Sequence, residues 1–366
     1  MMKINFTELK RGYEKYKKEY DKAAIEALES GWYILGKKVE EFENNFSNFV
    51  GAKHCVGVNS GLDALILAVR SLNIGRGDEV IVPANTYIAT VLGITENDAT
   101  PIFVEPDEYY NIDANKIEEK ITDRTKAIMV VHLYGQAANM KRIKEIADKH
   151  NLYLIEDCAQ SHGAKFEGKT TGTYGDIGCF SFYPTKNLGA FGDAGAIVTD
   201  NVEVAEKIKM LRNYGSQKKY HNKIEGINSR IDEIQASLLN VKLKHYNELR
   251  KQREKIANRY LSEITNPRVE LPKARKGSEH VWHLFEIRTA ERDKLQAYLR
   301  NNGIGTQIHY PIPPHLSEAY EYLGYKKGDF PITEKLADTL LSLPIYDGMK
   351  DEEIDYVIKI INEYES

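Results

Sequence analysis

Short apolar runs alternate with amphipathic segments over the first 200 residues of the chain. The apolar runs lack polar alternation, whereas a segment such as 37–49 repeats its apolar residues at helical intervals. This pattern is typical of a largely parallel sheet with helices on both faces, hence of an α/β fold with a mostly parallel mixed sheet. The expected strands are 56–58, 79–82, 101–104, 126–131, 152–156 and 177–183, and the expected helices are 37–49, 62–72, 86–97, 114–121 and 139–150.

The rest of the chain predicts a second, smaller α/β unit. We expect two domains, a large one at 1–245 that includes an N-terminal helix at 7–30, and a small C-terminal one at 246–366. A long helix at 230–264 would bridge them. The other expected elements are a helix at 202–213, a strand at 282–288, a helix at 290–302, a strand that ends at His309-Tyr310-Pro311, and helices at 333–342 and 351–364.

Composition indicates an ordinary globular protein and excludes several functions. Hydrophobic residues make up 42% of the chain and charged residues 28%, and the net charge of −4 argues against nucleic acid or an anionic membrane as the main partner. The three cysteines are an odd number and form no CxxC pair, so we expect a reducing compartment and no metal site. No apolar leader or run of about 18 apolar residues is present, which predicts a cytoplasmic protein.

One phosphate-binding motif is a false match. Residues 163–170 satisfy GxxxxGK[ST] letter for letter, but a P-loop needs a helix directly after the motif. The following residues, Thr171 to Gly175, cannot open a helix, so we expect a hairpin with Gly168 at its turn and no ATP hydrolysis. A GxGxxG that opens a βαβ unit is also missing, which weakens a nicotinamide or flavin interpretation.

Three other features together indicate a pyridoxal-phosphate site. Asp157 follows a buried strand, Lys186 follows another one about thirty residues later, and Ser60-Gly61 opens a helix. Alone, the aspartate would be read as a helix cap and the lysine as a surface residue. Pyridoxal phosphate, however, needs a lysine for the Schiff base, a carboxylate for the pyridine nitrogen, and donors such as those of a helix N-terminus for the phosphate.

The sequence resembles the DegT/StrS family of nucleotide-sugar aminotransferases, which are pyridoxal-phosphate enzymes of the aspartate-aminotransferase fold. The resemblance extends from about Gly31 to His315 and rests on seven motifs in the family's order. These motifs are NSGLDAL (59–65), GDEVIVPANTYIAT (77–90), VVHLYGQ (130–136), EDCAQSHGA (156–164), FSFYPTKNLGAFGDAGA (180–196), GINSRIDEIQA (226–236) and HYPIPPH (309–315).

The resemblance implies a role for each matching residue that faces the cofactor ring. Lys186 would form the Schiff base and move the proton between substrate and cofactor carbons. Asp157 would pair with the pyridinium nitrogen, Gln160 would bond the ring hydroxyl, and Tyr87 would stack on the ring.

The resemblance also implies a phosphate site and a shared active site. Ser181 and the helix start at Ser60, Gly61 and Leu62 would hold the phosphate, and Asn228 would reach it from the second subunit of a homodimer. The family usually has threonine at position 62, so leucine leaves only the backbone amide there. The segment before Gly31 also lacks the family's usual proline-containing opening.

The implied reaction moves an amino group from L-glutamate to a nucleotide-linked keto-6-deoxysugar. The nearest likeness is to enzymes that aminate a dTDP-3-keto-6-deoxyhexose, and 4-ketosugar transaminases are the alternative. His162, Tyr183, Arg230 and His309 are the candidate substrate contacts, with simple packing as the alternative for each. A cofactor-binding regulator or a noncatalytic scaffold is more remote, because no DNA-binding module accompanies the core. The lysine at 186 argues against the family's dehydratases, which carry histidine there.

Overall fold

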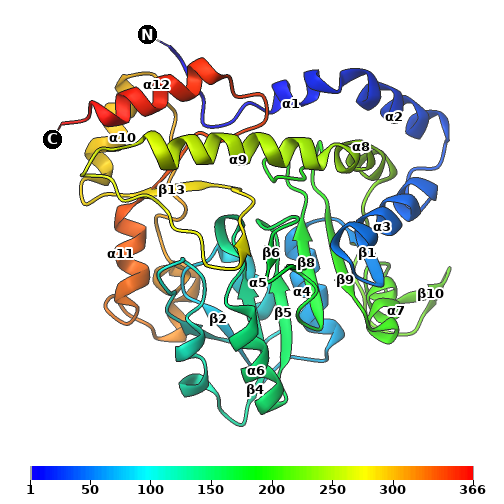
Figure 1. Ribbon diagram of the computed structural model, residues 1–366. Helices are drawn as coiled ribbons and strands as arrows, with labels where there is room; N and C mark the ends of the chain where they lie inside the picture. The colour runs from blue at the N-terminus through cyan, green and yellow to red at the C-terminus, as the bar shows by residue number, and fades with distance from the viewer. Residues whose placement is uncertain (1, 366) are drawn as a thin grey trace.

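The computed structural model describes residues 2–365 and is built around one seven-stranded sheet (Figure 1). The strands from β8 to β3 in this sheet run parallel, whereas β9 is antiparallel to both of its neighbours. The predicted mostly parallel mixed sheet is therefore confirmed. In spatial order the strands are β1 (His54–Val58), β9 (Gly195–Thr199), β8 (Ile177–Ser181), β5 (Tyr153–Asp157), β4 (Thr125–Val131), β2 (Glu79–Pro83) and β3 (Thr100–Val104).

Helices cover both faces of this sheet, which explains the absence of polar alternation in its strands. Along β4, Ala127 and Met129 pack into the core on one face, whereas Ile128 and Val130 pack into the core on the other. Every residue of the strand from Ala127 to Val131 is therefore buried. The covering helices are α3 (Lys37–Val50), α4 (Gly61–Ser71), α5 (Ile88–Thr95), α6 (Met140–His150), α7 (Val202–Leu211) and α8 (Glu233–Lys244).

The single long helix predicted at 230–264 is wrong. The chain instead forms α8 and then α9 (Tyr246–Glu263), with His245 in a non-helical conformation between them. The His245 ring stacks on Tyr16 at 3.9 Å and its Nε2 lies 2.9 Å from Glu19. These contacts come from the N-terminal region, which is itself two helices, α1 (Leu9–Lys15) and α2 (Lys17–Glu29), in place of the one expected. Tertiary contacts thus mark the break between two segments that share helical periodicity.

The helix predicted at 114–121 is also wrong. This segment forms two 3₁₀ turns, η1 (Ala114–Lys116) and η2 (Glu118–Lys120). Its buried residues, Ala114 and Ile117, are three positions apart, a spacing that a 3₁₀ turn places on one side. A third 3₁₀ turn, η3 (Leu133–Gly135), follows β4.

The C-terminal residues form a second core around a two-stranded sheet. Figure 1 shows α9 crossing above the main sheet toward this part of the molecule. The core of this C-terminal part also includes Ile4 from the N-terminus. The domain boundary at residue 245 stays a prediction. The elements are β13 (Phe285–Arg288), β14 (Leu340–Leu343), α10 (Arg292–Asn301), α11 (Pro331–Thr339) and α12 (Asp351–Asn362), with 3₁₀ turns η4 (Pro314–Leu316) and η5 (Glu318–Leu323).

The strand predicted to end at His309-Tyr310-Pro311 is wrong. The partner of β13 is β14, which was predicted to be part of a helix. From the predicted strand, Gln307 forms an isolated bridge to Ser342 of β14. All four residues of β14 are buried, and a strand of this length can be buried on both faces without polar alternation. Periodicity alone therefore could not separate it from the end of α11.

Two short pairings complete the fold. The hairpin predicted around Gly168 is confirmed as β6 (Lys165–Phe166) and β7 (Lys169–Thr170), and it is extended by β12 (Ser278–Glu279). Gly168 has a φ of 80° at the turn, where glycine is favoured. The other pair is β10 (Ser216–Lys218) with β11 (His221–Asn222). Within residues 2–365 no helix combines the length and the apolar character needed to cross a bilayer.

Candidate active site

The carboxyl ends of the parallel strands bring Asp157 into the interior of the molecule. Asp157 is the last residue of β5 and is only 5% exposed. Its carboxylate accepts hydrogen bonds from the Thr90 hydroxyl at 2.8 Å and from the Ala159 amide at 3.1 Å. Burial nevertheless raises the pKa of Asp157, although the hydrogen bonds and the positive charge of Lys186 oppose the shift. A cation beside this carboxylate would stabilise its charged form.

Lys186 lies in the turn that follows β8. The turn is closed by a hydrogen bond of 2.8 Å from the Lys186 amide to the Tyr183 carbonyl. Burial lowers the pKa of the Lys186 amine to about 8, and the negative charge of Asp157 works against this shift. No hydrogen bond or ion pair joins the two side chains within residues 2–365, although each charge changes the pKa of the other. The amine is therefore far more often neutral, and nucleophilic, than an ordinary lysine.

The start of α4 lies directly against the end of β8. Ser60 caps this helix by accepting a hydrogen bond of 3.1 Å from the Asp63 amide. A side chain at Gly61 would place its Cβ 2.4 Å from the Cβ of Ser181, so only glycine permits the close approach. The amides of Gly61 and Leu62 belong to the first turn, whose N–H groups have no acceptor inside the helix. A helix start beside a serine hydroxyl is a fitting site for a phosphate.

A network of amide and phenol groups surrounds Gln160. Its side-chain oxygen accepts a hydrogen bond of 2.7 Å from the Tyr134 amide, and its nitrogen donates to the Tyr310 hydroxyl at 3.0 Å. The Tyr310 ring lies 5.1 Å from the ring of Tyr87, which is 52% exposed. Gln160, Tyr87 and the 309–310 segment are therefore brought together.

The four predicted substrate residues lie in different surroundings. Tyr183 is 53% exposed, beside the Lys186 turn. His162 is fully buried between Phe180 and Phe182, at ring distances of 5.7 and 5.5 Å, and burial lowers its pKa to about 3. A fully buried ring has no surface for a substrate in this structure, so packing is the simpler interpretation of His162.

Arg230 and His309 are the other two predicted substrate residues. The Arg230 guanidinium donates a hydrogen bond of 2.9 Å to Asn213 and lies over the Tyr214 ring at 5.5 Å. His309 Nδ1 lies 2.6 Å from the Ser342 hydroxyl. Burial and the charge of Lys186 lower the pKa of His309 to about 4, which indicates that its ring lies within electrostatic reach of the lysine.

Asn228 is exposed on the surface of this single chain. Its backbone forms an isolated bridge to Asn213, and the neighbouring Ser229 donates a hydrogen bond of 2.7 Å to Asp63 in the first turn of α4. The segment thus runs past the start of α4. The role of Asn228 across a dimer stays a prediction.

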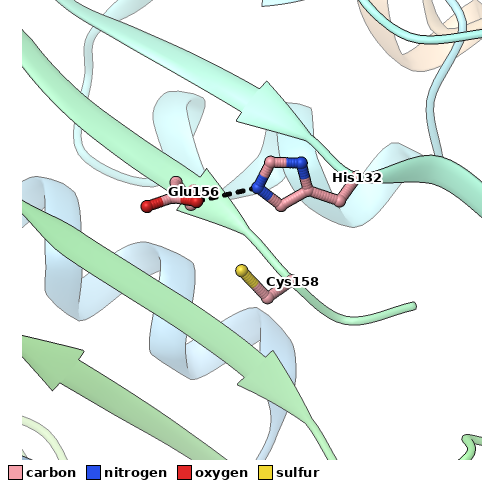
Figure 2. Close-up of side chains that lie close together, drawn as sticks. All are labelled: His132, Glu156 and Cys158. Atoms are coloured by element: carbon pink, nitrogen blue, oxygen red, sulfur yellow. Dashed lines mark hydrogen bonds and ion pairs between the residues drawn. The ribbon is translucent and has the colours of Figure 1, made fainter. Parts of the chain in front are cut away.

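His132, Glu156 and Cys158 lie close enough together to suggest a metal site (Figure 2). The hydrogen bonds argue otherwise. His132 Nδ1 accepts from the Ala138 amide at 3.1 Å, so its Nε2 carries the proton that it donates to Glu156 at 2.8 Å. Both nitrogens of the ring are therefore occupied.

The carboxylate of Glu156 is equally occupied. Its two oxygens also accept hydrogen bonds of 2.7 Å from the amides of Gly172, Tyr174 and Gly175. Burial raises the pKa of Cys158 well above the ordinary value, so its thiol is neutral in this hydrogen-bonded arrangement. The cluster is a hydrogen-bonded support for the strand end that carries Asp157, whose carbonyl accepts a bond of 3.1 Å from the His132 amide.

Sequence reasoning did not assign Thr90, Tyr134 or Tyr310 to the site. All three residues stand inside quoted motifs, so their positions were available as signals. Their partners, Asp157 and Gln160, are more than twenty residues away in the sequence.

A buried amine, a buried carboxyl group and a helix start beside a serine fit pyridoxal phosphate. A model of the DegT/DnrJ/EryC1/StrS aminotransferase family matches residues 14–362. The chain belongs to this family.

This aminotransferase has close relatives over its full length. A dTDP-3-amino-3,6-dideoxy-alpha-D-galactopyranose transaminase from Aneurinibacillus thermoaerophilus is 52% identical over 362 residues, with 99% of each chain covered. The crystal structure of DesV from S. venezuelae is 45% identical, with a TM-score of 0.97 over 99% of this chain and 98% of that chain. The crystal structure of NtdA from Bacillus subtilis with bound cofactor PMP is 32% identical, with a TM-score of 0.91 over 99% of this chain and 85% of that chain.

These comparisons confirm three predictions. The chain has the fold of pyridoxal-phosphate-dependent aminotransferases, it is an aminotransferase of this family, and its cofactor is pyridoxal 5′-phosphate. The roles of individual site residues stay predictions.

Proposed function

We propose that this aminotransferase transfers the amino group of L-glutamate to C3 of a dTDP-linked 3-keto-6-deoxyhexose, giving a dTDP-3-amino-3,6-dideoxyhexose. Support for the sugar comes from the relative at 52% identity, whose printed name is that of a transaminase for such a product. Support for the reaction comes from one structural observation: the buried Asp157 and the low-pKa Lys186 follow neighbouring strands, and each charge shifts the pKa of the other.

Within this proposal, four residues act on the cofactor ring. When bound, the cofactor supplies an electron-accepting ring that stores the amino group between the two half-reactions. Lys186 holds the cofactor through its amine and moves a proton at the reacting carbon, a role that its lowered pKa favours. Asp157 keeps the pyridine nitrogen protonated, Gln160 bonds the ring hydroxyl, and Tyr87 covers the ring face.

The phosphate is held at the start of α4. Ser60, Gly61 and Leu62 present the first turn of the helix, and Ser181 adds a hydroxyl from β8. The contact between Gly61 and Ser181 supports this assignment, because it brings the amides and the hydroxyl to one place. The leucine at 62 contributes its amide alone.

The ketosugar is bound by residues around the Lys186 turn. Tyr183 and His309 are the best placed, because one side chain is exposed beside the turn and the other lies within electrostatic reach of the amine. Arg230 contacts the diphosphate of the substrate. His162, buried against phenylalanines, acts by packing behind the site and not by contact with the sugar.

The active unit is a homodimer in which Asn228 reaches the phosphate of the other subunit. Exposed apolar side chains support a second copy as partner. In the segment between α2 and α3, Trp32 is 63% exposed, Tyr33 55% and Ile34 38%. An apolar run of this kind on the surface is typical of an interaction site.

The decisive experiment supplies the purified enzyme with cofactor, L-glutamate and a panel of dTDP-, UDP- and GDP-linked 3-keto and 4-keto sugars. Mass spectrometry then identifies the sugar that gains an amino group. We expect the dTDP-linked 3-keto-6-deoxyhexose to be converted and the Lys186→Ala variant to convert nothing. Preferential amination of a 4-ketosugar would contradict the proposal.

A further inference from the structure

A glutamate is buried in the small sheet next to the candidate active site. Glu286 lies in β13 and is 1% exposed, and it stands directly opposite Ser342 of β14 in the antiparallel register. The Ser342 hydroxyl donates a hydrogen bond to one carboxylate oxygen of Glu286. The other oxygen, Oε2, is buried without a hydrogen-bond partner among residues 2–365. A buried carboxyl group with so few donors is costly to ionise.

Ser342 also contacts His309, so a continuous chain of hydrogen bonds leads from Glu286 to the site. The backbone of Gln307 exchanges hydrogen bonds with Ser342, at 2.8 and 3.3 Å. His309 is two residues further along this extended segment, on the same side, and its Nδ1 lies 2.6 Å from the Ser342 hydroxyl. The His309 side chain is 17% exposed, and no hydrogen bond within residues 2–365 uses its Nε2.

The proton of the neutral His309 ring must be on Nδ1 or on Nε2, and the partner of Nδ1 decides which. When Ser342 donates to a Glu286 carboxylate, its oxygen accepts from Nδ1–H and Nε2 is left as an acceptor. When the Glu286 carboxyl group is neutral, it donates to Ser342, Ser342 donates to Nδ1, and Nε2 carries the proton. The two states differ in what His309 offers a substrate.

We propose that Glu286 and Ser342 are positioning residues that determine which ring nitrogen of His309 carries the proton, and thereby whether Nε2 donates a hydrogen bond to, or accepts one from, the ketosugar. The part that concerns the ketosugar rests on the proposed function, because it takes His309 as a substrate contact. Glu286 itself touches neither substrate nor cofactor.

The same arrangement gives a direction for pH dependence. Burial raises the pKa of Glu286 to about 8, so below that pH the carboxyl group is neutral and Nε2 is a donor suited to a keto oxygen. Above it, Nε2 becomes an acceptor. The titratable groups near Glu286, Ser342 and His309 include Tyr110, Tyr134, Tyr310, His283 and Lys186. The charged Arg288, two residues from Glu286 in β13, lies over the Tyr110 ring at 6.0 Å.

Only one of these neighbours titrates in the same range as Glu286. Burial raises the pKa of the three tyrosines and lowers that of His283, so all four stay neutral near pH 8. Lys186 has a pKa of about 8. The test therefore uses the holoenzyme, in which the Lys186 amine is bound to the cofactor.

The test is tautomer-sensitive NMR of histidine-labelled holoenzyme, with the His309 signal assigned from a His309→Gln variant. We expect the wild-type ring to exchange its Nε2 proton for an Nδ1 proton as the pH rises through about 8. The glutamine of Glu286→Gln cannot ionise and keeps a donor toward Ser342. In this variant the His309 ring should therefore keep the Nε2 proton at every pH. Glu79→Gln is the matched control, because Glu79 is 2% exposed in β2 and bonds the Thr122 hydroxyl.

Kinetics supply the second readout. Ser342→Ala breaks the chain, and we expect kcat/KM for the ketosugar to fall about tenfold, as loss of one orienting hydrogen bond implies. The half-reaction with glutamate should not change, and Ser342→Thr, which keeps the hydroxyl, should restore the lost activity. A His309 ring with one pH-independent tautomer in wild type and Glu286→Gln alike would overturn the proposal. Because the NMR readout needs no sugar, an enzyme that aminates no ketosugar would refute the proposed function separately.

Discussion

Gly61 of α4 packs directly against Ser181 of β8. A Cβ at position 61 would lie 2.4 Å from the serine Cβ and 3.0 Å from its Cα and Oγ. Neither strand nor helix can withdraw, because both belong to the core of the large sheet. The expected phosphate site therefore depends on glycine, which has no side chain, at position 61.

Gly61→Ala should weaken cofactor binding. The added methyl group overlaps Ser181, and overpacking of this kind costs about 1–3 kcal/mol. We expect the Kd for pyridoxal phosphate to rise at least about tenfold, measured by fluorescence titration of the apoenzyme. Gly12→Ala is the control, because its nearest neighbour, Asp347, would be 3.9 Å away. Equal affinity in the two variants would contradict a phosphate site at the start of α4.

The rate at which the apoenzyme captures pyridoxal phosphate should rise with pH around 8. The neutral amine is the nucleophile, and burial lowers the pKa of Lys186 to about 8 from the ordinary 10.5. Stopped-flow absorbance measures this rate. Asp157→Asn removes a negative charge that raises the lysine pKa, so the profile should shift to lower pH. A midpoint above pH 10 in wild type would show that the amine is not desolvated.

A mixture of two inactive variants should regain activity if the active sites are shared. Lys186→Ala lacks the reactive amine, and Asn228→Ala lacks the proposed contact across the dimer. After the two are unfolded together and refolded in equal amounts, about half of the dimers are mixed, and each has one intact site. We expect about a quarter of the wild-type activity. If Asn228 acts within its own chain, the mixture stays as inactive as its components.

Glu156→Gln should destabilise the protein, and added zinc should not change the stability of the wild type. The carboxylate accepts four hydrogen bonds, and an amide nitrogen in its place would face backbone donors. We expect a loss of about 2–4 kcal/mol in the free energy of unfolding, measured by urea denaturation. Glu206→Gln, in an exposed pair with Lys209, should change it little. A rise in the wild-type midpoint with added zinc would contradict the structural interpretation of this cluster.

Sequence patterns predicted six of the seven strands of the large sheet, all except β9, and one of the two strands of the small sheet, β13. Strands β2 and β4 contain unbroken apolar runs, Val80 to Pro83 and Ala127 to Val131, because cores lie on both of their faces. Glycine, proline or polar residues mark the ends of these strands. Segment 340–343 is also largely apolar and is followed by Pro344, but no glycine or proline separates it from α11. Its strand forms only because β13 provides a partner.

The sequence by itself determined the family, the cofactor and the strand ends that carry Asp157 and Lys186, because these depend on local patterns and on motif order. Only the tertiary structure decided the surroundings of those residues. Desolvation of Lys186, the bond from Thr90 to Asp157 and the chain from Glu286 to His309 join residues far apart in the sequence. Ionisation and tautomer depend on burial and neighbours in space, and no local pattern records those.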